Sequence, residues 1–287
     1  MAIVLGQNQY GKAESRVVHI SRNGPRHEIR DLNVSTSLRG DFAAAHLDGD
    51  QRNVLPTDSQ KNAAFAFARQ YGVDQIEDYA LLLAGHFVDD VEPVRSARVT
   101  VQELGWQRAS FDGVEHNHTW VRSGPEVRFA EATVEGSGGE QRLDLVSGLD
   151  DLVLLKSTGS EFAGFLHDEY TTLAETHDRV LATSLVARWR HTLTSADWAT
   201  SYADVRRILV EQFASVHSLA LQQTLWHMGR AVLQAHPLLA EIRLSAPNKH
   251  HFLVDLAPFG LDNPGEVYLA ADRPYGLIEA TVTRDDA

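Results

Sequence analysis

Residues 17–34 read VVHISRNGPRHEIRDLNV, and this stretch indicates the kind of sheet on which the fold is built. The run from Val17 to Arg22 is extended in character, and polar and apolar residues alternate again from Glu28 to Val34. Between them, Asn23-Gly24-Pro25 is typical of a turn. The stretch therefore predicts a β-hairpin, the pairing unit of an antiparallel sheet.

Helical patterns follow the hairpin. Residues 62–69 are rich in Ala and Phe, and residues 76–87 place apolar side chains at helical spacing. Strand patterns return over 94–135 and end at Gly136-Ser137-Gly138-Gly139, a composition typical of a boundary. We therefore expect two domains, residues 1–138 and residues 139–287.

The second half repeats the order of the first. Strand patterns over 143–155 and 186–193 precede a long helical stretch, in which Ser218 is the expected N-cap of the second helix and His236-Pro237 its end. Four strand-like segments finish the chain: 242–244, 251–256, 267–271 and 277–283. The repeated order predicts an α+β fold of two similar units, each with helices packed on an antiparallel sheet.

Composition excludes several classes of function. The 287 residues include 26 Lys and Arg against 39 Asp and Glu, a net charge of −13, which argues against binding nucleic acid or an anionic membrane through bulk positive charge. The chain has no Cys, which removes disulfides, thiolate catalysis and Fe–S clusters. It also lacks a signal-peptide pattern, an apolar run of about 18 residues and a C-terminal Ser-Lys-Leu. We expect a cytoplasmic protein.

Local motifs taken singly do not define a site. Residues 6–12 match GxxxxGK, but Ala13 replaces the Ser or Thr that would bind Mg²⁺, and a strand pattern follows instead of a helix, so we reject a phosphate-binding loop. His116 and His118 have the spacing of two metal ligands, but a turn with two exposed imidazoles is favoured. Thr57 and Gln60 have the spacing of a helix capping box.

Several segments along the chain carry a resemblance when they are taken together. The densest is LVLLKSTGSEFAGF at 152–165, continued by DEYTTL at 168–173 and by Asp178-Arg179. The others, in chain order, are Tyr10-Gly11-Lys12, TDSQKN at 57–62, His217-Ser218 with Leu221-Gln222, PNKH at 247–250 and DRPYGLIEA at 272–280. Together these segments resemble the urate oxidase (uricase) family. Because they follow one another from near residue 8 to near residue 283, the resemblance covers essentially the whole chain.

The resemblance implies the tunnelling fold (T-fold) and a particular assembly. Each half of the chain would be one T-fold unit, with helices on the outer face of its sheet. A homotetramer would close the sheets into a barrel, with active sites at the subunit interfaces. Thr57 and Asp58 would reach into the pocket of a neighbouring subunit.

It also implies how a flat, anionic purine is held. Arg179 would offer a planar fork of donors to one edge of urate, and Gln222 would pair with the opposite edge. Phe162 would stack on the ring, and the backbone amides of Asp58 and Leu221 would complete the in-plane contacts.

The reaction implied is urate + O₂ + H₂O giving 5-hydroxyisourate and H₂O₂, with no metal and no other cofactor. A Lys–Thr–His relay would map onto Lys12, Thr57 and His250, and Asn248 would hold O₂ or the attacking water above the ring. Two alternatives stay open: a pterin-handling enzyme of the same fold, which would recognise its ring with a Glu, and a non-catalytic purine-binding protein.

Overall fold

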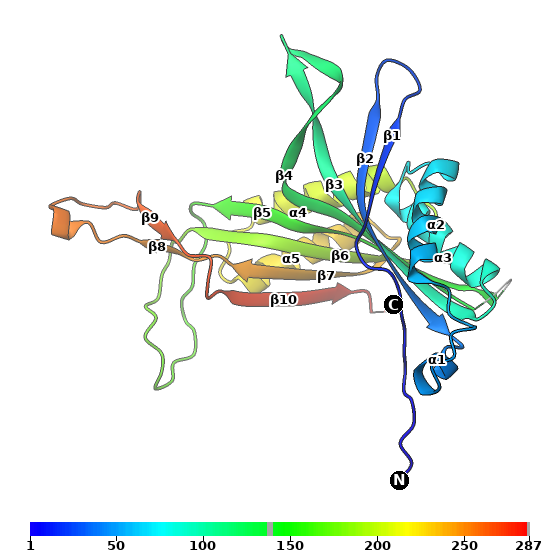
Figure 1. Ribbon diagram of the computed structural model, residues 1–287. Coiled ribbons are helices and arrows are strands. Elements are labelled where there is room, and N and C mark those ends of the chain that lie inside the picture. The colour runs from blue at the N-terminus through cyan, green and yellow to red at the C-terminus, as the bar shows by residue number, and fades with distance from the viewer. Residues whose placement is uncertain (137–139, 286–287) are drawn as a thin grey trace. The chain divides into compact units, whose positions relative to one another are not determined.

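The computed structural model describes residues 1–136 and 140–285 (Figure 1). The chain divides into two compact units: unit 1 comprises residues 1–148 and 190–201, and unit 2 comprises residues 149–189 and 202–287. The predicted domain boundary at 138/139 lies outside the described residues and stays a prediction. Unit 1 and unit 2 are named in this sense below.

Strands and helices follow one another in the predicted alternation. The strands are β1 Ser15–Ser21, β2 Glu28–Gly40, β3 Val94–Phe111, β4 Val114–Glu135, β5 Arg142–Lys156, β6 Leu181–His191, β7 Leu239–Asn248, β8 His251–Leu253, β9 Tyr268–Ala270 and β10 Gly276–Thr283. The helices are α1 Ala43–Leu47, α2 Thr57–Tyr71, α3 Ile76–Asp90, α4 Trp198–Ser215, α5 Leu221–Ala235 and the short 3₁₀ helix η2 Ala257–Phe259.

The strands confirm the predicted α+β fold with an antiparallel sheet. Eight of them are hydrogen-bonded in the order β1-β2-β3-β4-β5-β6-β7-β10. The predicted hairpin is β1 and β2, which pair antiparallel from Ser21 opposite Glu28 to Ser15 opposite Val34. Two of the predicted terminal strands do not join this sheet: β8 and β9 form a separate two-stranded ribbon that projects as an arm of unit 2 (Figure 1).

The core of unit 1 lies between its helices and its strands. The predicted helical face of α3 is buried, with Ile76, Leu83 and Phe87 fully inside. These side chains share one cluster with inward-facing residues of β3 and β4 such as Val99 and Ala132. Burying such large apolar side chains stabilises the unit by about 1.5–3 kcal/mol each, and this fixes where α2 and α3 lie against the sheet.

The core of unit 2 is built on α5, whose Leu225, Met228 and Val232 are buried against β7 and β10. Gly229 allows the close approach, since a Cβ there would lie 2.5 Å from Val282 Cγ2. The helix ends at Ala235, so the predicted stop at His236 is confirmed.

Two predicted helix caps are wrong, for the same physical reason. Helix α5 begins after Ala220, and Ser218 is fully buried, with its Oγ accepting a hydrogen bond from Thr224 Oγ1 (2.8 Å). Helix α2 begins at Thr57 itself, and Gln60 is buried with its Oε1 accepting a bond from Thr36 Oγ1 (2.6 Å). In both cases the hydroxyl of a threonine, and not a free backbone amide of the first helical turn, binds the polar side chain.

Residues 6–12, which carry the GxxxxGK motif, pack on the sheet, and no helix follows them directly in the chain. Tyr10 bridges to Leu38 of β2, and a Cβ on Gly11 would lie 1.8 Å from the carbonyl oxygen of Thr36. The next element is strand β1 and not a helix, which agrees with the absence of a phosphate-binding loop expected from Ala13 and the strand pattern. Within the described residues, no helix is long and apolar enough to cross a membrane.

Candidate functional site

The segment between β5 and β6 belongs to unit 2 and carries two of the predicted site residues. It has no helix or named strand of its own, but backbone hydrogen bonds fix its course. Phe162 and Thr176 exchange a pair of N–H···O bonds of 2.8 and 2.9 Å, and the Arg179 amide donates to the Ser160 carbonyl (2.9 Å). The two ends of the segment are thereby held side by side, with Phe162 on one and Arg179 on the other.

Arg179 is a half-buried cation without an anionic partner. Its Nε–H is buried and donates to no hydrogen-bond acceptor among the described residues, and no described carboxylate forms an ion pair with it. Its Cζ lies 5.6 Å from the centre of the Phe162 ring. Burial lowers the pKa of the Arg179 guanidinium. Because a buried charge is costly unless it is paired, this arrangement suits an anionic ligand that supplies the missing partner.

The start of α5 adjoins this segment. Ser160 forms an isolated parallel bridge with Ser218, and the Glu161 amide donates to the Ser218 carbonyl (2.7 Å). The first hydrogen bond of α5 runs from Thr224 N to Ala220 O (3.2 Å). The amides of Leu221 and Gln222 precede it and have no partner within the helix, as at any helix N-terminus, where such donors favour anions.

Asn248 and His250 lie where β7 ends in unit 2. Asn248 pairs with Gly276 of β10, and the next residue, Lys249, donates its amide to the Ala182 carbonyl of β6 (2.9 Å). The His250 ring stacks on Phe252 with centroids 5.6 Å apart. The backbone carbonyl of His250 accepts a hydrogen bond from the Ala271 amide (2.9 Å). Backbone hydrogen bonds therefore hold residues 248–250 on both sides, and they fix the positions from which the Asn248 and His250 side chains extend.

Lys12, Thr57 and Asp58 lie together in unit 1. The Lys12 amide donates to Thr36 Oγ1 (3.1 Å), and the same hydroxyl donates to Gln60 Oε1 in the first turn of α2. The pKa of Asp58 is lowered, chiefly by its hydrogen bond from Lys61 and in part by the charge of Lys12. The lysine thus stands next to a helix start whose first amides, including that of Asp58, precede the first helical hydrogen bond.

The predicted site residues therefore fall into two groups. The unit 1 group is Lys12, Thr57 and Asp58. The unit 2 group is Phe162, Arg179, Leu221, Gln222, Asn248 and His250. Each group contains one helix N-terminus with free amides and one or more cationic or titratable side chains.

Sequence reasoning gave no role to the polar residues that brace the unit 2 group. The Glu161 carboxylate contacts His217 Nε2 (2.6 Å) and His177 Nδ1 (3.3 Å), and these bonds, first that from His217, lower the pKa of Glu161. These residues stand inside or beside the segments that carry the family resemblance, which was the available signal. Their partners are distant in sequence, and spacing alone does not predict such contacts.

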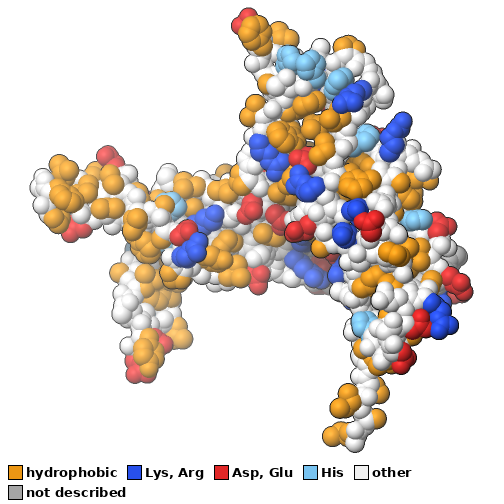
Figure 2. Space-filling model, in the orientation of Figure 1, with side chains coloured by type: hydrophobic (Ala, Val, Ile, Leu, Met, Phe, Trp, Pro, Cys, Tyr) orange, Lys and Arg blue, Asp and Glu red, His pale blue; other side chains and the backbone are white. Residues whose placement is uncertain are grey.

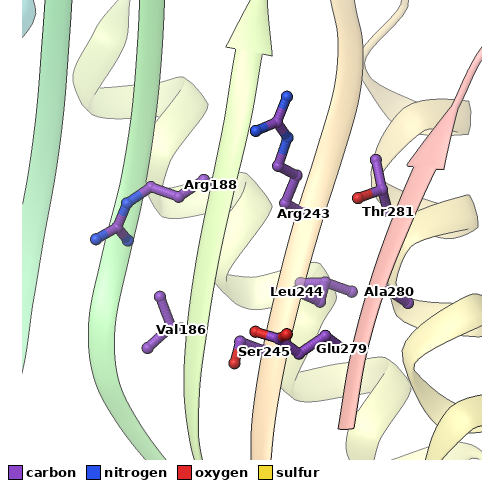
Figure 3. A pocket seen from close by; sticks show the side chains of 8 residues that line it. All are labelled: Val186, Arg188, Arg243, Leu244, Ser245, Glu279, Ala280 and Thr281. Atoms are coloured by element: carbon purple, nitrogen blue, oxygen red, sulfur yellow. The ribbon is translucent and has the colours of Figure 1, made fainter.

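Figure 3 shows side chains that line a hollow on the unit 2 sheet. The volume of this hollow is about 360 Å³, and none of its lining residues is a predicted site residue. Its two arginines already face carboxylates: Arg188 pairs with Asp150 (2.6 Å) and Arg243 with Glu241 (2.7 Å). Arg179, in contrast, has no carboxylate partner among the described residues. The hollow is therefore not a second anion site like the one at Arg179.

His116 and His118 are exposed, as predicted, but they lie on strand β4 and not in a turn. Their rings lie 4.4 Å apart, centre to centre. Over residues 1–136 and 140–285, no three His, Asp or Glu side chains are grouped as metal ligands.

Comparison with known proteins gives a consistent result. The family model described as uricase matches residues 8–133 and 145–279. A uricase from Arthrobacter globiformis is 54% identical over 283 residues, covering 99% of this chain and 91% of the relative. A uricase from Danio rerio is 36% identical, covering 96% and 93%. The crystal structure of the Arthrobacter globiformis uricase superposes with a TM-score of 0.94 at 52% identity, covering 100% of this chain and 97% of that one.

Proposed function

Because the chain belongs to the uricase family, we propose that it oxidises urate with O₂ and water to 5-hydroxyisourate and H₂O₂, a step of purine degradation. The observation that carries the site assignment is Arg179: a half-buried guanidinium with an unpartnered Nε, set against an aromatic ring and next to a helix N-terminus. A flat anion with carbonyl and N–H edges matches each of these features.

The unit 2 group acts as the clamp. Arg179 donates its planar fork to one edge of the purine, and Gln222, which has both a donor and an acceptor, pairs with the opposite edge. The ring of Phe162 stacks on the purine, and its own support is Phe165, which lies parallel to it at 4.7 Å. The free amide of Leu221 donates to the same anion.

Two residues of the unit 1 group, Lys12 and Thr57, begin the proton relay, and His250 of the unit 2 group completes it. Lys12 acts as the base that accepts a proton from urate. Thr57 passes the proton on to His250, and the Asp58 amide completes the contacts to urate. Urate loses two electrons, O₂ takes them up with two protons to become H₂O₂, and the oxygen of a water held by Asn248 adds to the ring.

The two groups meet between subunits in this proposal. Lys12 and α2 are tied together through Thr36 and Gln60, so one subunit provides Lys12, Thr57 and Asp58 together, and a neighbour provides the clamp. We infer a homotetramer of T-fold units with a closed barrel of strands.

The surface of the β8–β9 arm supports its burial in a subunit interface. The β8–β9 arm exposes several large apolar side chains: Phe252, Leu253, Phe259, Leu261 and Leu269. Figure 2 shows hydrophobic side chains in orange over this arm. Such patches are typical of interfaces.

The test is to follow urate absorbance and dissolved O₂ together after adding metal-free purified protein. Both are expected to fall together while H₂O₂ accumulates. If neither changes but calorimetry detects urate binding, the protein is a purine binder without this activity; absence of binding would refute the site as well. The pterin alternative is disfavoured because the carboxylate beside Phe162, Glu161, is engaged by two histidines.

A further inference from the structure

Arg179 has an acidic neighbour in sequence, Asp178, which nevertheless does not neutralise it. The Asp178 carboxylate accepts hydrogen bonds from Thr158 Oγ1 at both oxygens (2.9 and 2.8 Å) and from the Gly159 amide (3.1 Å). Both of its oxygens are thus occupied by residues at the other end of the same segment. The guanidinium next to it has no anionic partner within the described residues.

The bonds to Asp178 also fix the backbone that carries Arg179. The Thr176 hydroxyl donates to the Asp178 carbonyl (2.8 Å), and the Arg179 amide donates to Ser160 O (2.9 Å). Gly159 has a φ of +73°, a left-handed conformation that suits glycine and presents its amide to the carboxylate. Residues 158–160 and 176–179 are therefore joined by side-chain and backbone bonds together.

The same residues connect to the start of α5. Ser218 N donates to Gly159 O (2.9 Å), and Ser218 Oγ accepts from Thr224 Oγ1 inside the helix. A shift of residues 158–160 would therefore change the separation between Arg179 and the helix start that bears Gln222. In a clamp, that separation must match the width of the ligand.

We propose that Asp178 is a positioning residue for urate, acting through Thr158 and Gly159. It holds Arg179 at the correct distance from α5, and because its carboxylate is bound elsewhere, it leaves the charge of Arg179 available to an anionic substrate. This inference rests on the proposed function, and it adds to it a residue that does not touch the substrate.

The test compares four variants with the wild-type enzyme. Thr158→Val removes the hydroxyl while keeping the side-chain shape, and Asp178→Ala removes the acceptor; both side chains are exposed, so folding is expected to persist. Each is expected to raise KM for urate roughly tenfold, the effect of losing one charge-assisted hydrogen bond, with kcat within about twofold. Asp178→Asn can keep a hydrogen bond to each partner, because its amide nitrogen can donate to Thr158 Oγ1 and its amide oxygen can accept from the Gly159 amide. The KM of this variant is expected to lie within about threefold of the wild-type value.

The matched control is Thr171→Val. Thr171 Oγ1 donates to Asp168 (2.8 Å), which is a Thr–Asp pair of the same kind in the same segment, away from Arg179. Its KM is expected to stay unchanged. A lower KM in Asp178→Asn would show that charge and not position matters, and would overturn the proposal. An unchanged KM in both Thr158→Val and Asp178→Ala, or an equal rise in Thr171→Val, would do the same. A wild-type enzyme without urate oxidation would refute the proposed function instead, so the two failures are distinguishable.

Discussion

The starts of helices α2 and α5 resemble each other in build and differ in surroundings. Both follow a residue that makes no side-chain cap, Pro56 in unit 1 and Ala220 in unit 2, so the first amides of each helix are free. Around α5 stand a guanidinium without a partner and an aromatic ring. Around α2 stands a lysine, together with a carboxylate already bound by another lysine, Lys61. Under the proposed function, these two similar helix starts would take different tasks: the start of α5 would help to clamp the purine, and the start of α2 would lie beside the base, Lys12.

The largest expected effect breaks the unit 1 side of this contrast. Lys12→Met keeps the length of the side chain and removes the amine. We expect kcat to fall by about 10²- to 10⁴-fold, the range of general-base catalysis, while a non-reactive urate analogue still binds with nearly unchanged affinity. Near-normal turnover in this variant would refute the assignment of Lys12 as the base.

The next effect breaks the unit 2 side. Arg179→Ala is expected to raise KM about a hundredfold, since two charge-assisted bonds are lost, and Arg179→Lys is expected to recover only part of this because the planar fork is absent. Arg243→Ala is the matched control: this arginine is exposed and pairs with Glu241. An unchanged KM in Arg179→Ala, or an equal rise in Arg243→Ala, would contradict the clamp.

A smaller effect sharpens the contrast. Thr36→Val removes a hydroxyl that makes two hydrogen bonds: it accepts one from the Lys12 amide and donates one to the buried Gln60. Because this hydroxyl positions the base, we expect kcat to fall by about tenfold with KM unchanged. Ser35→Ala is the control, since Ser35 Oγ accepts the Glu14 amide (2.9 Å) in the same way one residue earlier. A change confined to KM would show that Thr36 supports substrate binding, and it would contradict a role for Thr36 in positioning the base.

The smallest effect concerns the support of α2. The hydroxyl of the buried Tyr79 donates to Ala64 O in α2 (2.7 Å), and burial raises the pKa of Tyr79. Tyr79→Phe is expected to lower the free energy of unfolding by about 1 kcal/mol at neutral pH.

The raised pKa also gives a pH dependence with a definite sign. Above about pH 10 the unfolded chain loses the tyrosine proton while the folded chain keeps it, so stability falls as pH rises, and this loss is expected to shrink in Tyr79→Phe. Urea midpoints measured from pH 7 to 11 check both points, with the exposed Tyr71→Phe as control. Identical alkaline curves for wild type and Tyr79→Phe would contradict the role given to burial.

Much of the fold is predictable from sequence because its signals are local. The turn at Asn23-Gly24-Pro25 fixed the first hairpin, and the spacing of Ile76, Tyr79 and Phe87 predicted α3 correctly. Helix α1 was not predicted, since its five residues have no buried side chain to create a pattern.

The site is harder to predict because its contacts are long-range. Gln60 carries ordinary capping chemistry, yet Thr36, which lies 24 residues earlier in the chain, binds it instead. The segment between β5 and β6 has no periodicity, and backbone bonds such as those between Phe162 and Thr176 shape it. The family resemblance named the residues, and the structure supplies their partners.

The central claim is that each active site combines the unit 1 group of one subunit with the unit 2 group of another. At urate concentrations well below the raised KM of Arg179→Ala, Lys12→Met and Arg179→Ala should each be nearly inactive alone. When the two variants are co-expressed and purified as mixed assemblies, random pairing of subunits is expected to restore about a quarter of the wild-type activity per subunit, because half of the sites in each mixed pair then contain both an intact Lys12 and an intact Arg179. If the mixed assemblies are as inactive as the separate variants, the two groups act within one chain and the account is wrong.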